Sequence, residues 1–188
     1  MRIAMLALVA GLAAAPASAQ TPREAISSGL SPEAAAVMFR DAVMTACVPA
    51  VAGSGVGGLP PAVRGKLQAS TDPEMRRQIG ATAEETVWDV IAGKGVVSIH
   101  EKPGRCVVSV YGPPAMATVM SIAAALVDGP GFERLAAAPP PNGFGQSLLR
   151  VENGKRIMVT VNGSEPGMPG HKSRFSVITA TVFGTPAG

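Results

Sequence analysis

Hydrophobic residues in the first third of the chain recur at helical spacing. Ser31-Pro32-Glu33 precedes them and supplies an N-cap, a proline for the first helical position and an acidic first turn. The pattern predicts a helix that Pro49 ends, with Cys47 on its buried side. The apolar stripe consists of Ala35, Phe39, Ala42, Val43, Ala46 and Cys47.

The segment from Pro60 to Ile91 is predicted to be a second helical region. Thr71-Asp72-Pro73-Glu74 repeats the combination of a capping residue and a proline, and Gly80 interrupts the segment. We therefore expect two shorter helices. Trp88, the only tryptophan, falls on the second helix and is predicted to anchor the core.

Two runs rich in β-branched residues follow, on either side of a Pro103-Gly104 turn. Centring the hairpin on this turn pairs Ile99 with Val108 and places Cys106 on the same apolar face. The opposite face carries Ser98, His100, Ser109 and Tyr111.

The rest of the chain predicts one more helix and three more strands. The helix runs from Ala115 to about Asp128. Asn153-Gly154 is a strong signal for a two-residue hairpin, and Phe175–Phe183 is expected to form the last strand. The fold class is therefore α+β, with a five-stranded, mostly antiparallel sheet. N-terminal helices and one crossing helix are expected to pack on it.

The N-terminus has the pattern of a secretory signal peptide over residues 1–19. A basic start precedes an apolar run from Ile3 to Ala15, and Ala17-Ser18-Ala19 suits a signal peptidase. The run is too short for a permanent membrane anchor. We expect a single domain over residues 20–188, with residues 20–30 as a flexible segment. The expected location is the periplasm or the exterior, without a lipid anchor.

Two cysteines, Cys47 and Cys106, remain after the predicted cleavage. In an oxidising compartment a lone pair of cysteines is expected to form a disulfide. A bridge closing a loop of this length stabilises a domain by roughly 4 kcal/mol. The alternative is a reactive thiol, which would need a nearby base such as His100 or His171.

Composition and motifs exclude several function classes. The formal net charge of +3 is far below the basic excess of a nucleic-acid-binding protein. Residues 53–58 fit GxGxxG, but no strand precedes them and Leu59-Pro60-Pro61 follows, so we expect a loop and no nucleotide. No cofactor motif is present. Two distant histidines without clustered carboxylates predict no metal site.

Two groups of residues are candidates for binding. Ser98, His100, Ser109 and Tyr111 form either a polar patch with a function or an ordinary exposed sheet face, and we favour the exposed face. Five cations exceed the acidic residues in the last third and could attract a small anionic ligand, although a solvated basic face is the simpler interpretation. These cations are Arg150, Lys155, Arg156, Lys172 and Arg174.

The chain resembles a group of uncharacterised small secreted proteins of proteobacteria. The resemblance depends on a helix with Phe39 and Cys47, then Trp88, then a strand that begins at Cys106. It covers roughly residues 38–111 and implies export, but it implies no activity and no catalytic residue.

The function expected from these patterns is an exported, non-enzymatic binding or accessory module with one disulfide. Its partner would be an envelope protein or a small anionic ligand, with no cofactor, nucleic acid or stable membrane insertion. A periplasmic hydrolase that uses His100 or His171 as a base is the first alternative. The second is a sensory domain with a ligand pocket, because the element order is similar to PAS-like or profilin-like folds.

Overall fold

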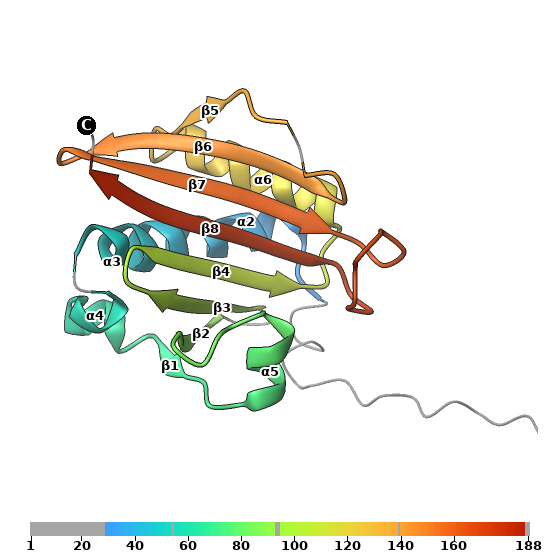
Figure 1. Cartoon of the computed structure of the whole chain (residues 1–188), viewed down its shortest axis with the longest axis horizontal. Helices are drawn as coiled ribbons and strands as arrows, with labels where there is room; N and C mark the ends of the chain where they lie inside the picture. The colour runs from blue at the N-terminus through green and yellow to red at the C-terminus, as the bar shows by residue number, and fades with distance from the viewer. Residues whose placement is uncertain (1–28, 54, 93–94, 139, 187–188) are drawn as a thin grey trace, which may run out of the picture.

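The computed structural model describes residues 29–53, 55–92, 95–138 and 140–186, and within these the strands form a single eight-stranded antiparallel sheet (Figure 1). The strand order is β1-β2-β3-β4-β8-β7-β6-β5. The strands are β1 (Gln68–Ala69), β2 (Thr86–Ala92), β3 (Gly95–Lys102), β4 (Arg105–Tyr111), β5 (Glu133–Leu135), β6 (Phe144–Glu152), β7 (Lys155–Ser164) and β8 (Val177–Pro186). The α+β class is confirmed, whereas the expected count of five strands is wrong.

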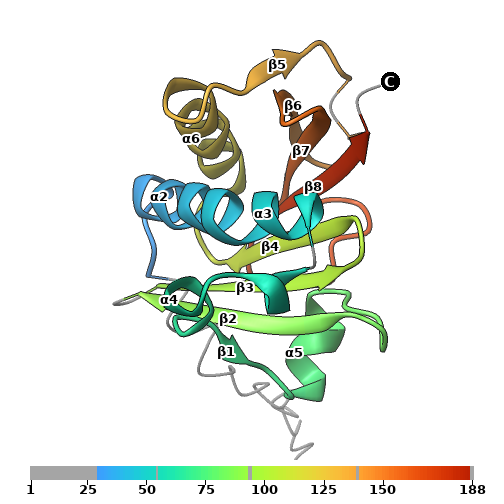
Figure 2. The ribbon, with the colours of Figure 1, turned by 90° about the vertical axis from the view of Figure 1, so that its left-hand side faces the viewer.

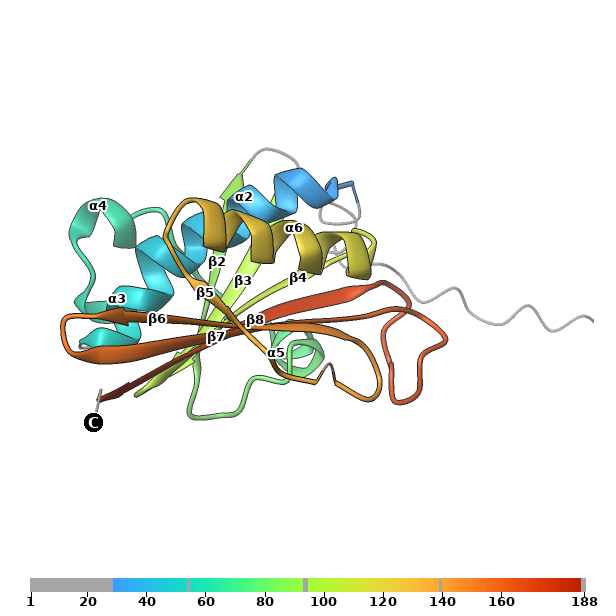
Figure 3. The ribbon, with the colours of Figure 1, turned by 90° about the horizontal axis from the view of Figure 1, so that it is seen from above.

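The sheet consists of two four-stranded meanders, β1–β4 and β5–β8, which meet where β4 pairs with β8. Helix α6 (Ala115–Asp128) connects the two meanders. With α2 (Pro32–Ala42) and α3 (Val48–Ala52) it covers one face of the sheet (Figure 2). The short helix α5 (Pro73–Gln78) lies on the opposite face, beside β2 and β3 (Figure 3).

The N-terminal helix starts as its sequence predicts but continues past Pro49. Ser31 caps α2, because its Oγ accepts a hydrogen bond from the Ala34 N–H at 3.2 Å. Between α2 and α3 the chain forms a π-helix, η1 (Val43–Cys47), immediately before the proline. A π-turn loosens the helical hydrogen bonding that the proline ring would otherwise disrupt, so the helix continues to Ala52.

The stretch from Pro32 to Ala52 is the one helix in the described residues that is long and apolar enough to cross a membrane. More than half of its most apolar window, 56%, is buried inside the fold. Its apolar side packs on α6 and the sheet, and Phe39, Val43 and Cys47 are fully buried there. Packing in the core therefore accounts for its composition.

The region between Pro60 and Ile91 differs most from the expected structure. Two short helices are present, α4 (Pro61–Arg64) and α5, but Trp88 lies on strand β2, opposite Ile99. The predicted helix around Trp88 is therefore wrong. Trp88 does pack against the core as a partly buried side chain.

The two predicted hairpins are confirmed in register. Ile99 pairs with Val108 across β3 and β4, and Glu152 pairs with Lys155 across β6 and β7. Asn153 and Gly154 both have positive φ, 50° and 69°, as a type I′ turn requires.

A disulfide joins Cys47 in η1 to Cys106 in β4, with the two Cα atoms 5.3 Å apart. Both cysteines are fully buried. The predicted bridge is thus present and ties the helix layer to the centre of the sheet.

Candidate functional site

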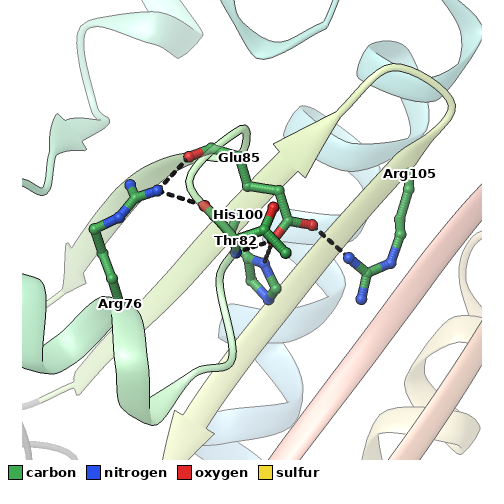
Figure 4. A network of polar contacts seen from close by, with 5 residues as sticks. All are labelled: Arg76, Thr82, Glu85, His100 and Arg105. Atoms are coloured by element: carbon green, nitrogen blue, oxygen red, sulfur yellow. Dashed lines mark hydrogen bonds and ion pairs between the residues drawn. The ribbon is translucent and has the colours of Figure 1, made fainter.

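The most concentrated polar chemistry in the described residues surrounds the buried carboxylate of Glu85 (Figure 4). Oε2 accepts a hydrogen bond from the Thr82 N–H at 2.9 Å and lies 3.1 Å from His100 Nδ1. Oε1 forms an ion pair with the Arg105 guanidinium. The side chain of Glu85 is 0% exposed and that of His100 is 2% exposed.

Local structure explains how these groups meet. A turn at residues 82–85 ends with Glu85 just before β2, and Arg76 from α5 holds it by donating to the carbonyl oxygens of Thr82 and Glu85, both at 2.7 Å. His100 lies on β3 and faces Val87 of β2. Arg105 opens β4, directly after the Pro103-Gly104 turn. Three separate segments therefore deliver one carboxylate, one imidazole and one guanidinium to the same point.

The electrostatics of the cluster favour an ionised Glu85 and a neutral His100. Burial alone would raise the pKa of Glu85, but the Thr82 N–H, His100 and Arg105 together lower it below its ordinary value. Burial lowers the pKa of His100, and Arg105 and Arg76 lower it further, while Glu85 opposes them. A neutral imidazole beside the carboxylate donates its Nδ1 proton to Glu85.

The lowered pKa of His100 predicts that acid destabilises the fold. As pH falls through about 6.5, the ordinary histidine pKa, His100 becomes protonated in the unfolded chain. In the folded chain it stays neutral, because its pKa there is lower. His100 therefore stabilises fully above that pH and progressively less on acidification, by at most about 1.4 kcal/mol per pH unit. Urea unfolding of wild type and His100→Gln between pH 7.5 and 5.5 measures this slope.

We expect the free energy of unfolding to depend less steeply on pH in His100→Gln than in wild type. Thr118→Val is the matched control, because it removes a fully buried hydroxyl that donates to the carbonyl oxygen of Pro114 and so leaves the titrating groups in place. It lowers stability at every pH but keeps the wild-type slope. A wild-type stability that rises on acidification over this range contradicts the prediction.

The polar patch predicted on the hairpin does exist, but it is buried. Exposed fractions are 2% for Ser98, 2% for His100, 1% for Ser109 and 4% for Tyr111. Ser98 pairs with Ser109 across the strands and donates to the carboxylate of Asp89 at 2.9 Å. The expectation of an ordinary exposed sheet face is therefore wrong, since α5 and the chain leading to β2 lie on this side of the sheet (Figure 3).

Sequence reasoning missed Glu85 and Asp89 because it placed their region on a helix. It missed Arg76 and Arg105 because no local pattern shows that a short helix and a hairpin turn come together at Glu85. A signal for a strand was present, because residues 86–91 are rich in β-branched side chains. A strand there places Asp89 on the same face as Ser98.

The second histidine lies in the loop between β7 and β8 and has a hydroxyl partner. Ser164 Oγ lies 2.8 Å from His171 Nδ1, and His171 Nε2 lies 2.9 Å from the carbonyl oxygen of Phe175. Both side chains are half-buried. The sequence analysis did not predict this contact, because it did not single out Ser164, which is the last residue of β7.

The five cations predicted as an anion site do not meet at one place. Arg150 lies 3.4 Å from Glu152 and over the ring of Phe132, and Lys155 donates to the carbonyl oxygen of Ala52. Arg156 is exposed on the opposite face from Lys155 because neighbours on a strand alternate. Lys172 and Arg174 follow the far end of β7.

In the glycine-rich segment 53–58, Gly55 and Val56 contact the carboxylate of Glu101. The Val56 N–H donates to Glu101 Oε2 at 2.8 Å, and a side chain on Gly55 would meet that carboxylate at 3.0 Å. These contacts join Gly55 and Val56 to Glu101 near the end of β3. The described residues hold no group of three or more His, Cys, Asp or Glu side chains suited to a metal ion.

The chain matches no protein-family model, no curated protein and no solved structure. Its resemblance to small secreted proteobacterial proteins stays a prediction, and the predicted signal peptide lies outside the described residues.

Proposed function

We propose that the protein is an exported binding or accessory module of the bacterial cell envelope. Its binding surface would be the open face, defined as the side of β6, β7 and β8 turned away from α2, α3 and α6 (Figure 1). Support for export comes from the signal-like N-terminus and from the buried disulfide, which persists in oxidising compartments.

The observation that carries the proposal is a row of incompletely buried apolar side chains across the open face. Strand register places Leu149, Met158 and Phe183 side by side, and Met158 is 37% exposed. On the neighbouring row Val151, 61% exposed, pairs with Arg156. The same side of β4 is buried at Val107, Ser109 and Tyr111, so the apolar row is confined to the C-terminal meander.

A shallow hollow of about 180 Å³ adjoins this row. Ser147, Thr160 and Asn162 line it from the open face, and Ala137, Ala138 and Pro140 supply one wall. Apolar contact area beside hydroxyl and amide groups is typical of protein contact surfaces. The exposed guanidinium of Arg156 favours a partner protein with an acidic residue at that position. The hollow is open to solvent and is lined by both polar and apolar groups, so it does not match the enclosed apolar pocket of a sensory domain.

A photo-crosslinking amino acid at position 158 tests the proposal in the native cell envelope. We expect a covalent adduct of one defined mass at position 158, and a lower yield of that adduct when Arg156→Glu is added. The matched control is position 37 on α2, which is 48% exposed but lies in the helix layer. Equal adducts at both positions, or none at position 158, would contradict a binding role for the open face.

A further inference from the structure

The loop after β7 holds a serine and a histidine in the arrangement of a nucleophile and its base. The carbonyl oxygen of Phe175 can only accept a hydrogen bond, so the neutral imidazole of His171 must carry its proton on Nε2. Nδ1 is then unprotonated and accepts the hydroxyl proton of Ser164 at 2.8 Å. A main-chain carbonyl thus fixes the tautomer that makes His171 a base toward Ser164.

The loop is built to hold this geometry. Its N–H groups close two successive turns, from Met168 to the Glu165 carbonyl at 3.1 Å and from His171 to the Met168 carbonyl at 3.0 Å. Gly167 and Gly170 occupy the left-handed region with φ of 93° and 78°. Ser164 itself is fixed by the last residue pair between β7 and β8, opposite Val177.

Ser164 also lies on the open face, next to the hollow. Alternation along β7 puts it on the same side as Asn162, which lines the hollow, roughly 7 Å farther along the strand. Its hydroxyl is half-buried, unlike the sealed hydroxyl of Ser109.

We propose that Ser164 is an activated nucleophile that accepts acyl groups from esters, with His171 as its general base. This activity goes beyond the proposed binding function. Ser164 Oγ forms a bond to the acyl carbon as its proton moves to His171 Nδ1. The ester C–O bond breaks and the alcohol leaves with the electron pair and that proton. Water then adds to the acyl carbon as one of its protons moves to His171 Nδ1. The bond between the acyl carbon and Ser164 Oγ breaks, His171 returns the proton to Oγ, and the acid leaves.

Acylation of the full chain by p-nitrophenyl acetate, followed by peptide mapping, tests the proposal on the wild-type protein. We expect acetyl-Ser164 to form at least about 100-fold faster than acetyl-Ser173, because general-base assistance contributes about 100-fold or more. Ser173 is the matched control: it lies in the same loop and its Oγ accepts from the Phe175 N–H at 3.1 Å, without a histidine partner.

Two variants separate catalysis from loop support. His171→Ala is expected to abolish the rapid acetylation while the Ser164 hydroxyl remains, and Ser173→Ala is expected to leave it intact. Thermal melting of each variant shows whether the fold survives. Equal acetylation of Ser164 and Ser173 in the folded wild type would overturn the proposal and leave His171 as a structural link between loop residues. That result leaves the crosslinking test of the open face unaffected, since the two experiments probe different groups.

Discussion

Removal of the disulfide by the double substitution Cys47→Ala and Cys106→Ala is expected to lower the free energy of unfolding by about 4 kcal/mol. The bridge closes a loop with a sequence separation of 59, which limits the freedom of the unfolded chain. Both cysteines are fully buried, so the lost sulfur atoms also remove packing between η1 and β4. A loss of this size is a large fraction of the stability of a typical domain.

Urea unfolding of three samples separates the two contributions. The wild type with its bridge intact is compared with the wild type reduced by dithiothreitol and with the double variant. If chain entropy dominates, the reduced wild type loses nearly as much stability as the double variant. A reduced wild type as stable as the bridged protein would show that the bridge contributes little and that packing explains the loss in the variant.

The same bridge connects stability to the predicted location. Protein recovered from its native cells, denatured and treated with an alkylating reagent, is expected to gain no mass and to begin near Gln20. Free thiols on a chain that still carries residues 1–19 would contradict both the predicted export and the bridge. In that case Cys47 and Cys106 would again be candidates for chemistry.

Local patterns predicted those parts of the fold that depend on neighbouring residues. The Ser31 cap, the Asn153-Gly154 turn and the pairing of Ile99 with Val108 each follow from a short segment, and each is confirmed. The disulfide was predictable from the cysteine count together with the expected compartment. These features were accessible because their energetics are local or covalent.

The errors arose where tertiary context decides the structure. Apolar residues at Val87, Trp88 and Ile91 fit a helical spacing, but pairing with β3 makes this segment a strand. Strand β5 has three residues and exists only through its pairing with β6, which no local signal indicates. The candidate sites were predicted incompletely for the same reason. His100 could be named from the sequence, but Glu85 and Ser164 come from segments whose positions depend on the assembled sheet.

Substitution of Glu85 by alanine is expected to destabilise the fold by about 3 kcal/mol. The change removes the acceptor shared by the Thr82 N–H, His100 and Arg105. The His100 Nδ1–H then stays buried without a partner, and this is the main cost, while the N–H of exposed Thr82 can turn to water. Arg105 adds less, because its side chain is 32% exposed and water replaces its partner.

The matched control is Glu84→Ala, an exposed carboxylate one residue earlier in the same turn, which is expected to change stability by less than about 0.5 kcal/mol. Glu85→Gln separates the effect of shape from that of charge, since the amide oxygen still accepts from the Thr82 N–H. Its loss of stability is expected to lie between those of Glu84→Ala and Glu85→Ala. Urea unfolding at pH 7 measures all three variants. Equal effects of Glu84→Ala and Glu85→Ala would show that the buried cluster does not support the fold.

The pH dependence of the Glu85 contribution distinguishes it from that of His100. The folded pKa of Glu85 lies below the ordinary value of 4.5, so its stabilisation is complete above that pH and is lost as pH falls through the folded pKa. His100 acts at higher pH, on acidification below about 6.5. Wild type is therefore expected to lose stability in two stages as the pH falls. Glu85→Gln is expected to keep the stage that belongs to His100 and to lack the more acidic stage that belongs to the carboxylate. Because Arg76 of α5 donates to the carbonyl oxygen of Glu85, the same measurements report on the contact that joins α5 to this cluster.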